Sequence, residues 1–224
     1  MKLLDDLYYY PWTSFTENNC NTYFIDGEVK TLIDPGHLHL FSHVIDGMAE
    51  DGLSLDDVDV VIATHSHPDH FEGSVRFHGK PVRIGMHEEG ERYLAEIGPA
   101  FYQAVGQKMP RFRVDFHLQE GELHLGSKTF QILYTPGHDP GAICIYWPEK
   151  KVLITGDVIF KEGVGRTDFP QCSGRQLIQS ILRLKDLDVE YLLPGHGDIV
   201  TGKREVNRNF AVIESLYFPM MQHS

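Results

Sequence analysis

Short apolar runs broken by turn-forming residues fill the first third of the chain. Asp26-Gly27 and Asp34-Pro35-Gly36 separate these runs, and turns of this composition join consecutive strands. We therefore predict an antiparallel meander. Its predicted strands are residues 7–12, 22–26 and 30–33. Between residues 38 and 49 the apolar positions recur at three- and four-residue spacing instead, which predicts a helix.

Beyond residue 50, strand-like runs alternate with amphipathic segments. The further predicted strands are residues 58–63, 82–86, 113–118, 122–125, 129–134, 142–147, 152–155 and 191–193. The further predicted helices are residues 69–77, 88–97, 175–184 and 203–217, and residues 98–110 show no clear pattern. Strands with helices set between them are typical of layered αβ/βα sheets. Because no linker or repeat interrupts the pattern, we expect one α/β domain over residues 1–224.

Charge and composition narrow the choice of partners. The 224 residues include 20 Lys and Arg against 32 Asp and Glu, for a net charge of −12. A surface this acidic repels phosphate backbones, so we expect no nucleic-acid partner. The apolar runs are far shorter than the roughly 20 residues of a membrane helix, so we expect no membrane partner. Asp5 and Asp6 interrupt any signal-peptide core and the three cysteines lie far apart, which favours the cytoplasm.

Histidine is the unusual component, with 13 in the chain. The segment Thr64-His65-Ser66-His67-Pro68-Asp69-His70 directly follows a predicted strand, and its proline makes it a loop. In a loop, its first two histidines can converge on one ion. Its aspartate and last histidine, at the start of the next helix, can meet a second ion. Imidazole and carboxylate ligands suit Zn(II), iron or manganese.

Three further loops place ligand-type residues just past a strand end, each beside a glycine that lets the backbone approach closely. They are Thr135-Pro136-Gly137-His138, Gly156-Asp157 and Pro194-Gly195-His196-Gly197. Chance explains one His-x-His loop in a chain rich in histidine, but it does not explain four loops of the same design. The other histidines, including His37, receive no functional role.

With these loops the chain resembles the metallo-β-lactamase fold superfamily, whose signature is His-x-His-x-Asp-His followed by His, Asp and His. The resemblance implies a four-layer αβ/βα sandwich and two divalent metal ions, with zinc favoured and iron or manganese as alternatives. The implied ligands are His65, His67 and His138 for the first ion, Asp69, His70 and His196 for the second, and Asp157 as a bridge. Asp34 in Leu32-Ile33-Asp34-Pro35-Gly36 is implied to orient a ligand histidine.

Other segments resemble the glyoxalase II-like branch. They are Asn19-Cys20-Asn21, Gly156-Asp157-Val158-Ile159-Phe160 and Gly163-Val164-Gly165-Arg166-Thr167-Asp168-Phe169-Pro170. The branch hydrolyses thioesters such as S-lactoylglutathione, which implies a small acyl-thiol substrate. Full-length members add a helical extension with glutathione contacts, whereas this chain ends about one helix after His196 and is similar to the short relatives. Arg166, helped by Lys161, is the expected contact to an anionic part of the substrate.

The implied chemistry is hydrolysis by a water whose pKa falls toward roughly 7 between two ions, with Asp69 and Asp157 as the catalytic carboxylates. Persulfide dioxygenases of the same superfamily are the first alternative, because they use one iron held by the equivalents of His65, His138 and Asp157. The loop around His196 favours the hydrolase. A metal-binding scaffold without turnover is the third hypothesis.

Overall fold

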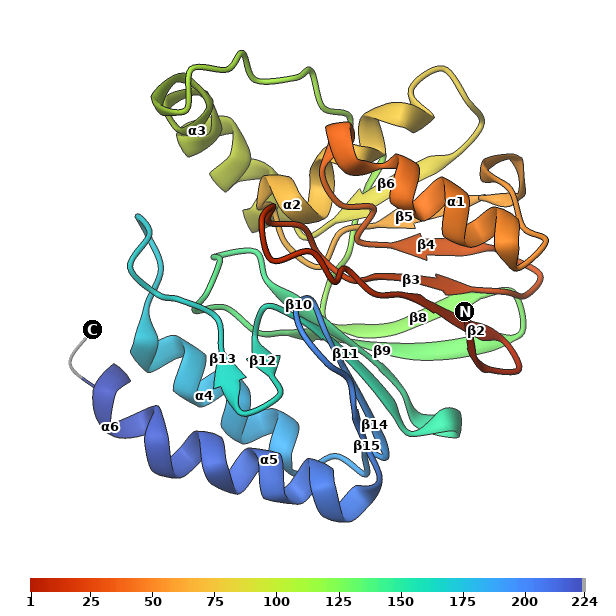
Figure 1. The fold of residues 1–224 in the computed structure, drawn as a ribbon. Coiled ribbons are helices and arrows are strands. Elements are labelled where there is room, and N and C mark those ends of the chain that lie inside the picture. Colours follow the sequence, from red (N-terminus) through yellow and green to blue (C-terminus); the bar gives the residue numbers. More distant parts are fainter. Residues whose placement is uncertain (223–224) are drawn as a thin grey trace.

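Two β-sheets pack face to face with helices on their outer sides in the computed structural model, which describes residues 1–222 (Figure 1). The predicted four-layer αβ/βα architecture is thereby confirmed. The strands of the first sheet, in spatial order, are β1 (Lys2–Leu4), β2 (Leu7–Tyr10), β3 (Thr22–Ile25), β4 (Thr31–Ile33), β5 (Val60–Ile62), β6 (Arg83–Met86) and β7 (Phe116–His117). β2 to β4 form the predicted antiparallel meander. β1, which was not predicted, extends it by one antiparallel strand, and β4 to β7 run parallel.

The second sheet is mostly antiparallel. Its strands, in spatial order, are β15 (Val200–Thr201), β14 (Tyr191–Pro194), β11 (Val152–Gly156), β10 (Ile143–Trp147), β9 (Lys128–Tyr134) and β8 (Gly121–Leu125). β11 and β14 are its one parallel pair among the described strands, so their carboxyl ends lie at the same edge. A separate short hairpin joins β12 (Ile159–Phe160) to β13 (Gly163–Val164).

Helices cover the outer face of each sheet (Figure 1). The helices beside the first sheet are α1 (Ser42–Glu50), α2 (Pro68–Phe71) and α3 (Glu88–Ala104), and those beside the second are α4 (Gly174–Lys185), α5 (Lys203–Leu216) and α6 (Phe218–Met221). Short 3-10 segments occupy Leu38–Leu40, Leu55–Asp57, Glu72–Phe77 and Pro148–Lys150. Within residues 1–222, no helix combines the length and the apolar character that crossing a membrane requires.

Three apolar layers hold these elements together. The layer between the sheets includes Ile33 and Ile62 from the first sheet and Ile132, Ile145 and Leu193 from the second, all fully buried. Two further layers lie between each sheet and its helices. Burying each such aliphatic side chain contributes about 1.5–3 kcal/mol to stability. The strand ends that carry the loops are therefore fixed by a continuous core.

The helix predicted over residues 69–77 is divided in the structure. α2 ends at Phe71, and a 3-10 segment follows. Gly73 explains the break, because its N–H donates to the carbonyl of Gly36 over 2.7 Å rather than to the preceding helical turn. A Cβ at Gly73 would lie 2.7 Å from the carbonyl oxygen of Pro35, so only glycine allows this approach. The Asp34 turn and the histidine loop are thus held together.

Two other predicted elements differ in length. The helix predicted over residues 88–97 continues as α3 to Ala104, although Pro99 lies inside it. Pro99 withholds one backbone N–H, but Ala95, whose carbonyl loses that donor, is exposed to solvent. The strand predicted over residues 113–118 is reduced to β7. The Asp115 carboxylate accepts the N–H of Ile84 over 2.8 Å and so replaces part of the ladder.

Candidate metal centre

The predicted ligands lie in the connections that follow strands at one edge of the two sheets, with Asp69 and His70 in α2 and the others in loops. The loop after β5 carries His65, and the loops after β11 and β14 carry Asp157 and His196. These strands belong to parallel pairs, which brings their carboxyl ends to the same edge. The Gly195 N–H donates to the carbonyl of Gly156 over 2.8 Å, which holds two of the loops in register. The topology therefore gathers residues that lie far apart in sequence.

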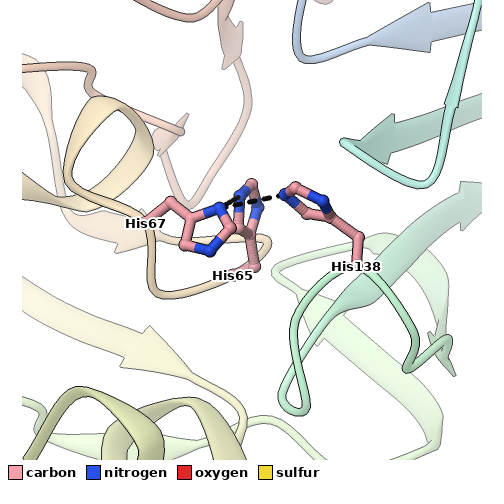
Figure 2. Close-up of side chains that lie close together, drawn as sticks. All are labelled: His65, His67 and His138. Atoms are coloured by element: carbon pink, nitrogen blue, oxygen red, sulfur yellow. Dashed lines mark hydrogen bonds between the residues drawn. The ribbon is translucent and has the colours of Figure 1, made fainter. Parts of the chain in front are cut away.

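Three imidazoles form the first cluster. His67 Nδ1 lies 3.2 Å from His65 Nε2 and 2.9 Å from His138 Nε2. Figure 2 shows the three rings converging from two loops. His65 and His138 are buried, and His67 is partly exposed to the cavity described below. Three nitrogen atoms this close can all ligate one ion.

The second cluster consists of Asp69, His70 and His196. His196 Nε2 lies 3.3 Å from His70 Nε2 and 3.3 Å from Asp69 Oδ2. The Asn18 amide donates to the same Asp69 oxygen over 2.5 Å and fixes the carboxylate from outside the cluster. These three residues also place one ligand atom each within reach of a single ion.

Asp157 lies between the two clusters. Its Oδ2 is 3.5 Å from His138 Nε2 in the first cluster and 3.4 Å from His196 Nε2 in the second. Its Oδ1 is 3.1 Å from His70 Nε2. A single carboxylate therefore faces ligand nitrogens of both clusters, as a bridging ligand would.

The outer nitrogens of the histidines have partners of their own. His138 Nδ1 donates to the carbonyl of Arg166 over 2.7 Å, because a carbonyl only accepts. His70 Nδ1 lies 2.9 Å from Asp34 Oδ2, and Asp34 also accepts the N–H and the hydroxyl of Thr64 over 2.7 Å each. The Thr64 hydroxyl in turn lies 3.1 Å from His65 Nδ1. These contacts fix the rings with Nε2 turned inward. The structure thus places Asp34 where the resemblance implies, beside a candidate ligand histidine.

The centre fits metal ions on two observations that do not depend on ligand type. Asp157 Oδ1 is buried and lies 3.1 Å from His70 Nε2, but no N–H or O–H group of the described residues reaches it with hydrogen-bond geometry. Glycines crowd the same point. A Cβ at Gly195 would lie 2.3 Å from Asp157 Oδ1, and a Cβ at Gly165 would lie 2.7 Å from the His138 ring. The fold keeps this space clear around a buried carboxylate, which suits a bound cation.

The pKa values of the histidines are shifted in opposite directions in the two clusters. Burial and, to a lesser extent, the neighbouring His138 lower the pKa of His67 to about 4, so His67 is neutral at pH 7. Burial also acts to lower the pKa of His196, but the carboxylates of Asp157 and Asp69 outweigh it and raise that pKa to about 9. Burial opposes the charge on Asp157, yet His70 and His196 hold the pKa of its carboxyl well below the usual range. The centre is therefore anionic at its middle.

Comparison with known proteins identifies the family. Residues 15–196 match the family model described as the metallo-beta-lactamase superfamily. The chain belongs to that superfamily. It is similar to the hydroxyacylglutathione hydrolase GloC of Haemophilus influenzae, with 36% identity over 206 residues that cover 89% of this chain and 94% of GloC. Membership and this relative together support a metal-dependent hydrolase.

Solved structures of metallo-β-lactamase proteins agree with the fold. TTHA1623 in a di-iron-bound form has 29% identity and a TM-score of 0.72, over 94% of this chain and 98% of that one. ETHE1 of Myxococcus xanthus has a TM-score of 0.66 over 97% of this chain and 85% of that one. At 22% identity, this second likeness shows the fold alone.

A cavity of about 640 Å³ lies beside the metal centre of this metallo-β-lactamase superfamily protein. Side chains of both clusters form one end of it, and α3 forms a wall. Arg166 also lines it, but its guanidinium is bonded to both oxygens of Asp168, over 2.6 and 2.5 Å. Lys161 lies instead beside a second hollow of about 240 Å³, with its ammonium 2.8 Å from Asp198. Of the two expected substrate contacts, Arg166 faces the cavity and Lys161 lies beside the other hollow.

Several buried residues near the centre were not singled out from the sequence. Asp139 is fully buried and accepts the Ser66 hydroxyl over 2.5 Å, which joins the loops that carry His67 and His138. Glu72 is 6% exposed and lies 2.9 Å from Nδ1 of His37, which lines the cavity. The position of Asp139 directly after His138 was the available signal.

Proposed function

We propose that this protein is a binuclear metal-dependent hydrolase of thioesters such as S-lactoylglutathione or a related acyl-thiol. One observation carries the proposal: the Asp157 carboxylate lies within 3.5 Å of ligand nitrogens of two separate clusters at one end of the cavity. Two ions that share a carboxylate and face a cavity are the arrangement of metal-assisted hydrolysis. The similarity to GloC, a hydroxyacylglutathione hydrolase, supports the thioester class.

The residues have distinct roles in holding the ions. His65, His67 and His138 would hold the first ion, and Asp69, His70 and His196 would hold the second. Asp157, which faces both clusters, would contact both ions. Divalent ions held there supply Lewis acidity, because they lower the pKa of a coordinated water toward about 7 and polarise an acyl carbonyl. Zinc is the proposed metal because nitrogen and carboxylate ligands in this ratio suit it, and iron and manganese are the alternatives.

The protein's own groups position the reaction and move its proton. Asn18 and His196 hold Asp69 beside the cavity, where its carboxylate takes the proton that the attacking water loses. The water oxygen forms a bond to the acyl carbon, the carbon–sulfur bond breaks, and the proton passes to the departing thiolate. A thiolate is a good leaving group, so the reaction requires no stronger acid than Asp69.

The test compares two reactions on metal-replete protein. We expect hydrolysis of S-lactoylglutathione or of a simple acyl thioester, measured as release of free thiol, without oxygen uptake. Oxygen consumption with glutathione persulfide, at one iron per chain, would instead assign the dioxygenase chemistry that His65, His138 and Asp157 can support. Bound metal with turnover in neither assay would contradict both enzymes and leave the scaffold hypothesis.

A further inference from the structure

The wall that α3 contributes to the cavity is apolar. Tyr93, Ile97 and Phe101 recur at four-residue spacing on α3 and all line the cavity, with Leu94 beside them. Residues four apart share one face of a helix, so α3 presents a continuous apolar strip. Phe101 remains 40% exposed, although a side chain of its size is usually buried. An apolar strip left open beside a reaction centre is surface that a ligand can cover.

The segment that begins at β12 forms a second wall, which is also apolar. Phe160, Phe169 and Pro170 line the cavity from the segment after β11, which lies across from α3 in Figure 1. The amide of Gln171 donates to Glu96 on α3 over 3.1 Å and joins the two walls. Apolar side chains thus enclose the space between the walls.

The position of α3 is fixed in the described structure. Near the carboxyl end of α3, the Tyr102 hydroxyl donates to the buried Glu72 over 2.5 Å. Near its amino end, a Cβ at Gly141 would lie 2.0 Å from the backbone nitrogen of Gly90, so the backbones touch. The strip therefore stands at a set distance from the centre, as the walls of preformed ligand sites do.

Charge at the cavity offers little compensation for an occupant with several negative charges. Among the residues of the described chain that line it, Arg166 carries the one fixed positive charge, and Asp168 already neutralises it. The Arg166 guanidinium carbon also lies 4.3 Å above the Phe169 ring, which adds to the apolar wall. A glutathione moiety brings two carboxylates, and the described lining offers them a single arginine, Arg166, which is already paired with Asp168.

From these contacts we propose that the substrate is a thioester whose acyl part is apolar, a medium-chain or aromatic acyl group, and that the α3 strip of Tyr93, Ile97 and Phe101 binds it. This inference rests on the proposed function, since it names the substrate class of the same site. Each buried methylene then strengthens binding about three- to fivefold until the cavity is filled.

The test uses metal-replete protein with acetyl, butanoyl, hexanoyl and phenylacetyl thioesters of one small neutral thiol, N-acetylcysteamine, and with S-lactoylglutathione. We expect kcat/KM to rise at least tenfold from acetyl to hexanoyl, and S-lactoylglutathione to be a poorer substrate than hexanoyl. Phe101→Ser and Ile97→Ser should each lower the hexanoyl-to-acetyl ratio of kcat/KM several-fold. Val105→Ser is the matched control, because Val105 is 55% exposed just past α3 and does not line the cavity.

The outcomes separate this inference from the function on which it rests. Hydrolysis of thioesters with equal kcat/KM along the acyl series, unchanged by Phe101→Ser, would overturn the apolar site and leave the hydrolase standing. Failure to hydrolyse any thioester would overturn both. A hexanoyl preference that Val105→Ser also abolishes would show that the α3 strip is not its source.

Discussion

A single carboxylate, that of Asp157, links the two ligand clusters. It is buried, it faces nitrogens of both clusters, and one of its oxygens lacks a hydrogen-bond partner among the described residues. Buried anions of this kind are costly to the fold unless a cation compensates them. Asp157 is therefore expected to serve the reaction more than the stability of the chain.

Replacing Asp157 tests that expectation. Asp157→Ala should lower kcat/KM for the best thioester by about a thousandfold or more, because several kcal/mol of charge stabilisation are lost. Its circular dichroism spectrum should remain that of the native protein. Asp198→Asn, an exposed acid paired with Lys161, is the control and should stay within about twofold. Near-normal turnover by Asp157→Ala would show that the bridge is assigned to the wrong residue.

The Arg166 guanidinium can pair either with Asp168 or with a carboxylate of the substrate. In the structure it pairs with Asp168, and both side chains are more than half exposed. A carboxylate on the thiol part of a substrate can replace Asp168 without moving the guanidinium far. We predict that Arg166→Ala raises KM for a thioester with a carboxylate on its thiol part by about ten- to a hundredfold, the value of a lost charged hydrogen bond.

The neutral thioester of N-acetylcysteamine provides the comparison for Arg166. Its KM should change much less, so the ratio of the two KM values is the measurement. Arg183→Ala is the matched control, since Arg183 is another exposed arginine paired with an acid, Glu120, and lies outside the cavity lining. Equal losses on both substrates would mean that Arg166 supports its loop instead of binding the substrate.

At the scale of elements, glycines at strand ends decide how closely the loops approach the centre. Gly195 follows β14, and a Cβ there would lie 2.3 Å from Asp157 Oδ1 and 2.6 Å from the His70 ring. Gly195→Ala should therefore displace the second cluster and lower metal content toward one ion per chain, with at least a tenfold loss of kcat. Metal binding and kcat should therefore be affected more strongly than the stability of the fold.

The control for Gly195 lies in the hairpin of β12 and β13. A Cβ at Gly163 would meet only side-chain atoms at 3.6 Å or more, so Gly163→Ala should keep both metal content and kcat. Elemental analysis and steady-state kinetics on the two variants measure the difference. If Gly195→Ala bound two ions and turned over normally, the close approach at this strand end would have no function.

The elements that carry the ligands could be predicted from the sequence because their signals are local. The buried strand before His65 and the turn at Asp34 follow from apolar runs and turn residues alone. The second half of α3 could not be predicted, since Gly98 and Pro99 are typical of a helix end. Tertiary contacts stabilise the second half of the helix: Tyr102 donates a hydrogen bond to Glu72, and Met109 packs beside Gly98. The apolar wall of the cavity was missed for the same reason.

At the scale of the whole molecule, the metal centre joins the two sheets. The connection after β5, which includes α2, supplies His65, His67, Asp69 and His70, and loops of the second sheet supply His138, Asp157 and His196. No sequence pattern shows that these loops meet, because the pairing of strands across the molecule brings them together. Ions bound there are held by both halves of the chain, so their affinity contributes to the stability of the whole fold.

Metal removal is therefore expected to destabilise the protein as well as inactivate it. At free metal about a hundredfold above the dissociation constant, each independently bound ion adds about 2.7 kcal/mol to the free energy of unfolding, and two ions add about 5.4 kcal/mol. For a chain of this size, loss of both ions corresponds to a loss of roughly 10 to 20 °C in Tm after chelation, measured by calorimetry with and without a chelator. Elemental analysis of the replete protein should give two ions per chain. A content that never exceeds one ion, unchanged in Asp69→Ala and His70→Ala, would rule out the second cluster as a metal site. An unchanged Tm in the presence of two ions would show instead that the ions do not hold the sheets together.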